Sequence, residues 1–158
     1  MVVACPITIS VAPGDFDVAA DMVALSEGRL DMGAIASFVG LCRDEGGQLS
    51  ALELEHYPGM AEAELSSIAA EAAQRWPLMG IVIRHRYGQI QPGERIVAVI
   101  CAASHRGAAL AATDFIMDFL KSRAPFWKKE HRHKESKPGW VDAREADETA
   151  LKRWEGAL

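Results

Sequence analysis

Three Pro-Gly pairs occur in the first two thirds of the chain, and the turns that they predict limit the folds that it can adopt. They stand at residues 13–14, 58–59 and 92–93, and each follows a segment whose side chains alternate with a two-residue period. A Pro-Gly pair forms a turn, because proline fixes φ and glycine accepts a positive φ. The three alternating segments are therefore predicted to be short strands, at residues 7–11, 52–57 and 81–87.

Segments with helical periodicity lie between and after these strands. The four predicted helices cover, approximately, residues 15–26, 60–76, 107–123 and 142–154. Asp15 or Asp17 can cap the first helix, and Asp142 can cap the last. The inward side of the third helix is expected to consist of Leu110, Ala111, Phe115, Phe119 and Leu120.

The remaining segments decide the fold class. The apolar run at residues 34–39 indicates a buried strand, and residues 96–102 are expected to pair with 81–87 as an antiparallel hairpin. Residues 126–139 are polar and basic and are expected to be irregular, with a short strand at residues 140–141. Strands and helices in this mixed order predict an α+β fold, with helices packed on a largely antiparallel sheet. We expect a single domain over residues 1–158.

Charge is divided unevenly along the chain. The formal net charge is −5, from 17 Lys+Arg and 22 Asp+Glu. Residues 1–80 hold 3 basic and 12 acidic side chains, whereas residues 81–158 hold 14 basic and 10 acidic ones. A net acidic chain argues against a general nucleic-acid binder, while the basic second half suggests a localised anion site. A solvated charged surface is the alternative.

Several other classes are unlikely. Cys5, Cys42 and Cys101 are scattered, which suggests reduced thiols in a cytoplasmic protein rather than a disulfide framework. No apolar run approaches the ~18 residues of a membrane span, so no membrane association is expected. No P-loop, dinucleotide fingerprint or nucleophile elbow occurs, and no metal is expected. Cys42 has no identifiable histidine partner and is a weak candidate nucleophile.

The first candidate site is the stretch Ser104-His105-Arg106-Gly107, where an apolar strand gives way to a helix. The N-terminus of a helix presents free N–H groups and binds anions readily, and His105 and Arg106 add donors and charge. The alternatives are a helix cap with a solvated arginine and a structural histidine.

The second candidate site contains two lysines. Lys121 falls in the last turn of a predicted helix, and Lys128 follows a Pro-Phe-Trp stop. If the chain folds back, both lysines face one pocket, and each ammonium group disfavours the charge of the other. One of them then becomes a usable proton donor or acceptor. For Lys121, the alternative is a cation placed to complement the helix dipole.

Arg43 is a weaker third candidate. It lies in a loop directly after a predicted buried strand, which is a common position for functional residues. The alternative is a simple ion pair with Asp44 or Glu45.

These segments together resemble the MoaE family, the large catalytic subunits of molybdopterin synthase. The resemblance spans about residues 5–154. It is carried by residues 33–40 (GAIASFVG), 52–60 (LELEHYPGM), 75–78 (RWPL), 85–88 (HRYG), 104–106 (SHR), 115–130 (FIMDFLKSRAPFWKKE) and 140–144 (WVDAR), with Arg43-Asp44 and Pro92-Gly93-Glu94. The motifs at 54–60 (LEHYPGM) and 121–128 (KSRAPFWK) are long and specific.

The resemblance implies a function that residue patterns alone do not give. Members of the family convert cyclic pyranopterin monophosphate (precursor Z) to molybdopterin by building its dithiolene. The sulfur comes from a thiocarboxylate at the Gly-Gly C-terminus of a small ubiquitin-like partner subunit. The implied assembly is a homodimer of large subunits within a heterotetramer. The implied fold is of the α/β-hammerhead type, and no cofactor is implied.

The resemblance also suggests roles for particular residues. Lys121 and Lys128 match the essential lysines of the family, with Lys121 beside the incoming tail and Lys128 binding substrate or moving protons. The positions matched to substrate or tail binding, or adjoining them in the pocket wall, are Arg43, His105, Arg106, Lys129, Glu130 and Arg144.

Two features depart from the family pattern. Leu41 stands where related sequences often carry a basic residue. Residues 131–139 are more basic than in the family pattern, and this segment is expected to be either a mobile substrate flap or a solvated loop. Two alternative functions remain at this stage. One is a non-catalytic module that binds a pterin or the tail of a partner. The other is transfer of sulfur or acyl groups to a different phosphorylated heterocycle.

Overall fold

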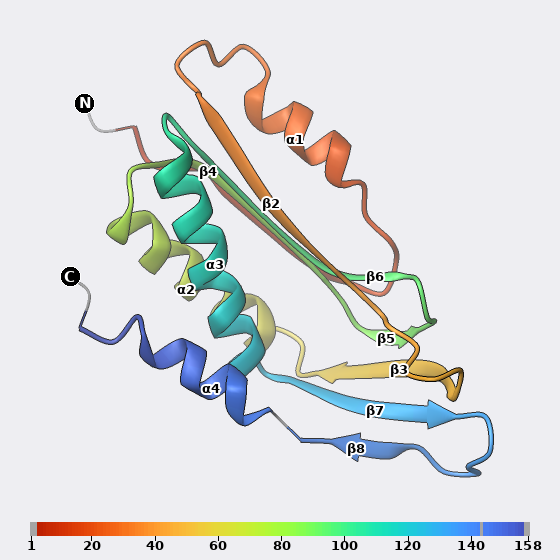
Figure 1. The fold of residues 1–158 in the computed structure, drawn as a ribbon. Helices are drawn as coiled ribbons and strands as arrows, with labels where there is room; N and C mark the ends of the chain where they lie inside the picture. The colour runs from red at the N-terminus through yellow and green to blue at the C-terminus, as the bar shows by residue number, and fades with distance from the viewer. Residues whose placement is uncertain (1–2, 143, 157–158) are drawn as a thin grey trace.

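The part of the chain that the structure describes forms two four-stranded sheets and four helices (Figure 1). This computed structural model describes residues 3–142 and 144–156. The elements in chain order are β1 (Ile7–Ala12), α1 (Val18–Ser26), β2 (Ala34–Leu41), β3 (Leu49–His56), α2 (Met60–Arg75), β4 (Leu78–Arg86), β5 (Gly88–Ile90), β6 (Arg95–Ala103), α3 (Arg106–Ser122), β7 (Phe126–Arg132), β8 (Gly139–Val141) and α4 (Glu145–Lys152). The predicted α+β class and the mostly antiparallel pairing are confirmed.

The first sheet has the strand order β1-β4-β6-β2. The β1–β4 pair is parallel, and the other two pairs are antiparallel. Figure 1 shows α2 and α3 on one face of this sheet and α1 on the other. Side chains alternate across the sheet, so Ile81 and Ile83 of β4 reach the core, whereas Arg84 turns to α1 and pairs with Asp21 at 2.7 Å.

The second sheet has the order β5-β3-β7-β8 and lies across one end of the first (Figure 1). All of its pairs are antiparallel. The chain passes from the first sheet to the second after β2, after β4 and, through α3, after β6. The main core lies between the first sheet and helices α2 and α3, where Leu65, Ile83 and Ile116 have no measurable exposure.

Local sequence signals explain the helix boundaries. Asp17 caps α1, because its side chain accepts a hydrogen bond from the Ala20 amide at 3.0 Å. Gly59 precedes α2 with φ = 84°, a left-handed conformation that glycine adopts freely, and its N–H donates to Glu62 at 2.8 Å. The predicted bounds of α1, α2 and α3 are thus close to the observed ones.

Four expectations about these elements were wrong. The strand at residues 34–39 is the edge strand β2, and only Ala36 in it is buried. Leu110, expected to face inward, is 58% exposed, since α3 turns its small residues and Ile116 to the sheet instead. Asp142 does not cap α4, which begins at Glu145 after Arg144. Residues 126–139 are not irregular throughout, because β7 pairs with β3 from Phe126 to Arg132.

Candidate functional site

A large pocket opens where the two sheets meet the C-terminal end of α3. Its volume is about 930 Å³, within the range of pockets that hold small organic ligands. The walls come from the end of β2 and its loop, from β3, from β7 and from the segment around residue 144. Five of the residues selected from sequence line this one pocket: Arg43, Lys121, Lys128, Glu130 and Arg144.

The two lysines approach from different elements. Lys121 stands in the last turn of α3 and is exposed, whereas Lys128 is half-buried on the strand β7. The fold-back between them is made by the short turn through Pro125. Burial lowers the pKa of Lys128 most, and the nearby charge of Lys121 lowers it further; Asp147 opposes this shift, and Arg144 adds a smaller lowering effect. An ammonium group with a lowered pKa gives up its proton more readily than an ordinary lysine.

The mouth of the pocket carries two arginines that share one carboxylate. Glu45 forms an ion pair with Arg43 and lies 3.8 Å from Arg144. All three side chains are more than half exposed, so the pairs are accessible to solvent and to competing anions. The ion pair with Glu45, given above as the alternative to a functional role for Arg43, is therefore present, and it lies at the pocket mouth.

The floor of the pocket is apolar. Leu54 of β3 is 1% exposed and Met117 of α3 is 7% exposed, and both lie beneath the charged rim. Cys42 also lines the pocket but is 3% exposed, and burial raises the pKa of its thiol. A thiol in this state is a poor nucleophile. The pocket thus combines an apolar surface for a ring with cations for negative groups.

Three selected residues do not line this pocket. His105 and Arg106 stand at the opposite end of α3, about 22 Å from Lys121 at 1.5 Å per helical residue. Lys129 points to the other face of β7, where its ammonium group pairs with Glu55 and lies 4.4 Å above the ring of Trp140. Strand alternation separates it from Lys128.

Sequence reasoning missed several residues that do line the pocket. His85 was assigned to a strand face and given no role, although it stands at the end of β4. Arg123, Asp147 and Glu45 were also passed over as candidates. The HRYG motif could have marked His85 as a candidate. Asp147 could not be selected from the sequence, because it reaches the pocket only through the packing of α4 beside α3.

Within residues 3–142 and 144–156, no group of three histidine, cysteine or acidic side chains is arranged to hold a metal ion. In the same ranges, no helix has both the length and the apolar character needed to cross a bilayer.

Comparison with known proteins identifies the family. The family model described as MoaE protein matches residues 11–123, more than half of the chain. The chain belongs to the MoaE family. It is 61% identical over 150 residues to the molybdopterin synthase catalytic subunit of Mesorhizobium japonicum, covering 95% of this chain and 94% of that protein. The resemblance stated from the sequence is confirmed.

Solved structures of MoaE proteins share the fold. The molybdopterin cofactor biosynthesis protein E from Burkholderia multivorans superposes with a TM-score of 0.80 at 47% identity, over 94% of this chain and 97% of that one. A complex of subunits 1 and 2 of molybdopterin-converting factor from Helicobacter pylori contains a chain with a TM-score of 0.70 at 21% identity, covering 86% and 91%. At that identity the likeness concerns the fold alone.

Proposed function

We propose that the pocket between the two sheets carries out the sulfur transfer of molybdopterin synthase. The chain is an enzyme of molybdenum cofactor biosynthesis and has the activity of its family, a catalytic subunit of molybdopterin synthase. The convergence of Arg43, Lys121, Lys128 and Arg144 over an apolar floor is the observation that carries the assignment of this pocket. The substrate is proposed to be cyclic pyranopterin monophosphate.

The chemistry of the two reactants matches this lining. The substrate combines a flat heterocycle with a phosphate, and the sulfur donor is an anionic thiocarboxylate. A ring can lie against Leu54 and Met117, while the arginines at the mouth bind the phosphate through charge-assisted hydrogen bonds. Cations fixed in place before the reaction stabilise charge that develops during it.

The two lysines are given different tasks. Lys121 is exposed at the rim, where its charge would stabilise the incoming thiocarboxylate and the negative charge that builds up as its carbonyl is attacked. Lys128 is more buried and has a lowered pKa, so it is suited to donating and accepting a proton at the substrate. Glu130 lines the pocket but pairs with Arg132 at 2.8 Å, which suggests that it orients the wall.

The proposed partner is a small ubiquitin-like subunit with a Gly-Gly C-terminus. The MoaE-fold chain from Helicobacter pylori is described in a complex of two subunits, which supports a partner of this kind. A Gly-Gly tail has no side chains and can therefore enter the pocket beside Lys121 with little steric hindrance. A cytoplasmic location stays a prediction.

The expected homodimer would give His105 and Arg106 a place in catalysis. In the described chain, β2 pairs with β6 on one side and leaves its other edge free. The start of β2 adjoins the end of β6, next to His105, while the end of β2 leads to Arg43. Antiparallel pairing of two β2 strands would therefore bring Arg106 of one copy toward the pocket of the other.

The test compares two neighbouring lysines of β7. Lys128→Ala is expected to abolish dithiolene formation from precursor Z and thiocarboxylated partner in a single-turnover product analysis. Lys129→Ala, on the opposite face of the same strand, should retain most of the activity because that side chain lies outside the pocket. Full activity of Lys128→Ala would overturn the assignment of the pocket.

The same analysis separates the alternatives. A non-catalytic binding module would bind precursor Z and the tail without forming product. An enzyme for a different phosphorylated heterocycle would leave precursor Z unchanged, even with a fully thiocarboxylated partner. Product that depends on Lys128 excludes both.

A further inference from the structure

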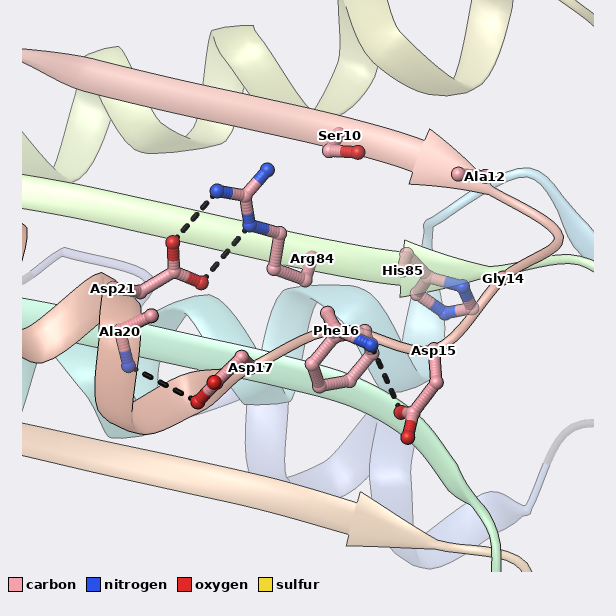
Figure 2. A pocket seen from close by; sticks show the side chains of 10 residues that line it. All are labelled: Ser10, Ala12, Gly14, Asp15, Phe16, Asp17, Ala20, Asp21, Arg84 and His85. Atoms are coloured by element: carbon pink, nitrogen blue, oxygen red, sulfur yellow. Dashed lines mark hydrogen bonds and ion pairs between the residues drawn. The ribbon is translucent and has the colours of Figure 1, made fainter.

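A second, smaller cavity lies on the α1 side of the first sheet. Its volume is about 320 Å³, and Figure 2 shows the charged side chains that line it. Asp21 pairs with Arg84, and Asp17 caps α1, so these groups already have partners. One residue, His85, lines both this cavity and the large pocket. His85 therefore belongs to the wall between the two.

The imidazole ring of His85 is fixed on two sides. It stacks on the ring of Phe126, with centroids 3.7 Å apart and planes 10° apart. Its Nδ1 lies 2.8 Å from the carbonyl oxygen of Arg86. A carbonyl only accepts, so in the neutral ring Nδ1 carries the proton and donates it. Stacking and hydrogen bond together hold the ring in one orientation.

Phe126 is the first residue of β7 and stands two residues before Lys128. Side chains two apart on a strand share a face, so Phe126 and Lys128 both point to the pocket. Phe126 also lies in register with His56 of β3, with their rings 6.0 Å apart. The start of β7 is thus held by aromatic contacts to two other strands.

Burial, helped by neighbouring positive charges, keeps the His85 ring neutral. Burial is the largest cause that lowers its pKa, the hydrogen bond to the Arg86 carbonyl opposes it, and the charges of Lys128 of β7, Lys121 of α3 and His56 of β3 add smaller lowering effects; together they bring the pKa to about 4. On the side of the small cavity the charged groups are Asp15, Asp17, Asp21 and Arg84. A neutral ring adds no third positive charge beside the two lysines, and it stacks on Phe126 without the desolvation cost of a cation.

We propose that His85 is a positioning residue for Lys128. Its neutral ring, held by the Arg86 carbonyl, fixes Phe126 at the root of β7 and so keeps the ammonium group of Lys128 half-buried in the pocket. The catalytic consequence rests on the function proposed above. The placement of Lys128 does not, because it can be measured without substrate.

The experiment compares three variants. His85→Ala removes the stack, His85→Phe preserves it with a ring of similar shape, and Tyr57→Ala is the matched control. Tyr57 does not line the pocket and makes an exposed edge contact with Trp127, the residue before Lys128, with centroids 5.3 Å apart. Circular dichroism and thermal unfolding check that each variant is folded. The pKa of Lys128 is measured by NMR titration of its side chain in the free protein.

We expect His85→Ala to raise the pKa of Lys128 toward the ordinary lysine value, because its surroundings become wetter. Turnover should fall by about tenfold to a hundredfold, as misplacement of a catalytic group by about 1 Å typically does, with KM changed by less than about threefold. His85→Phe should stay within about threefold of the parent at pH 7 and keep the lowered pKa. Tyr57→Ala should match the parent in both measurements.

Each contrary result is informative. An unchanged Lys128 pKa and unchanged turnover in folded His85→Ala overturn the proposal. Losses in His85→Phe as large as those in His85→Ala overturn it as well, because the stacked ring alone would then not be what places Lys128. If His85→Ala does not fold, Phe126→Leu tests the same stack from the other side and must raise the Lys128 pKa. If the unsubstituted protein never makes product, the proposed function is refuted. A raised Lys128 pKa in His85→Ala would still support the positioning role in that case.

Discussion

A mixed dimer tests whether one active site is built from two copies of this chain. Arg106 begins α3 and Lys121 stands in its last turn, about 22 Å away, which is farther than one phosphorylated pterin can span. If both residues serve the same reaction, they must come from different copies. A dimer that carries Arg106→Ala in one copy and Lys121→Ala in the other should then contain one intact pocket and one pocket with both changes.

The expected magnitudes follow from this arrangement. Loss of one charge-assisted hydrogen bond to a phosphate costs about 1.5–3 kcal/mol, so the Arg106→Ala homodimer should lose about tenfold to a hundredfold in kcat/KM. The Lys121→Ala homodimer should be inactive. The mixed dimer should recover about half of the parent activity per dimer, because one of its two pockets is complete.

The assay uses two affinity tags. The two variants are co-expressed with different tags, and the mixed dimer is purified over both columns before single-turnover product analysis. The doubly substituted chain paired with an unsubstituted one is the control. In a shared-site dimer, that pair has one damaged residue in each pocket and should be far less active than the mixed dimer. Equal activity of the two arrangements, higher activity of the control pair, or a monomer in solution would refute the shared site.

Three further outcomes are expected. Glu45→Gln frees the two arginines at the pocket mouth and should strengthen binding of inorganic phosphate by about twofold to fivefold at low salt in calorimetry, with Asp142→Asn at the same rim as the control that leaves the ion pairs in place. Lys121→Met should raise the pKa of Lys128 measured by NMR, because it removes a neighbouring positive charge that lowers that pKa; an unchanged value would contradict the coupling. Leu65→Ala leaves a cavity in the main core and should lower the free energy of unfolding by about 2–5 kcal/mol in urea titration. A loss below about 1 kcal/mol would contradict this expectation, because neighbouring core side chains would then have moved in to fill the cavity.

The sequence was most informative where local chemistry decides the structure. Asp17 and the Pro58-Gly59 pair specify helix starts through hydrogen bonds within a few residues, and both were placed close to their observed positions. Lys121 and Lys128 were expected to face one pocket if the chain folds back after Pro125, and both do line the same pocket. Such features depend on neighbours in the chain, so a single sequence contains them.

The features that failed depend on distant partners. Strand β7 carries polar side chains on both faces and has no apolar alternation, so its pairing with β3 cannot be read from residues 126–132. Ala34–Leu41 looked buried because it is apolar, yet its position at an edge follows from strand order. The distance between Arg106 and Lys121 was implicit in the predicted helix length, but the two were assigned to one site through the family resemblance.

Alternation along β7 also explains how an acidic chain builds a basic pocket. Lys129 and His131 point outward and contact Glu55 and Glu53 of the neighbouring strand, so the charge of Lys129 is offset on the outer face. Lys128 points inward, where burial and neighbouring cations lower its pKa. The carboxylates of the acidic first half thus neutralise one face of the sheet and leave the pocket face positive. A net charge of −5 is therefore compatible with an anion site, because charge is sorted between two faces of one strand.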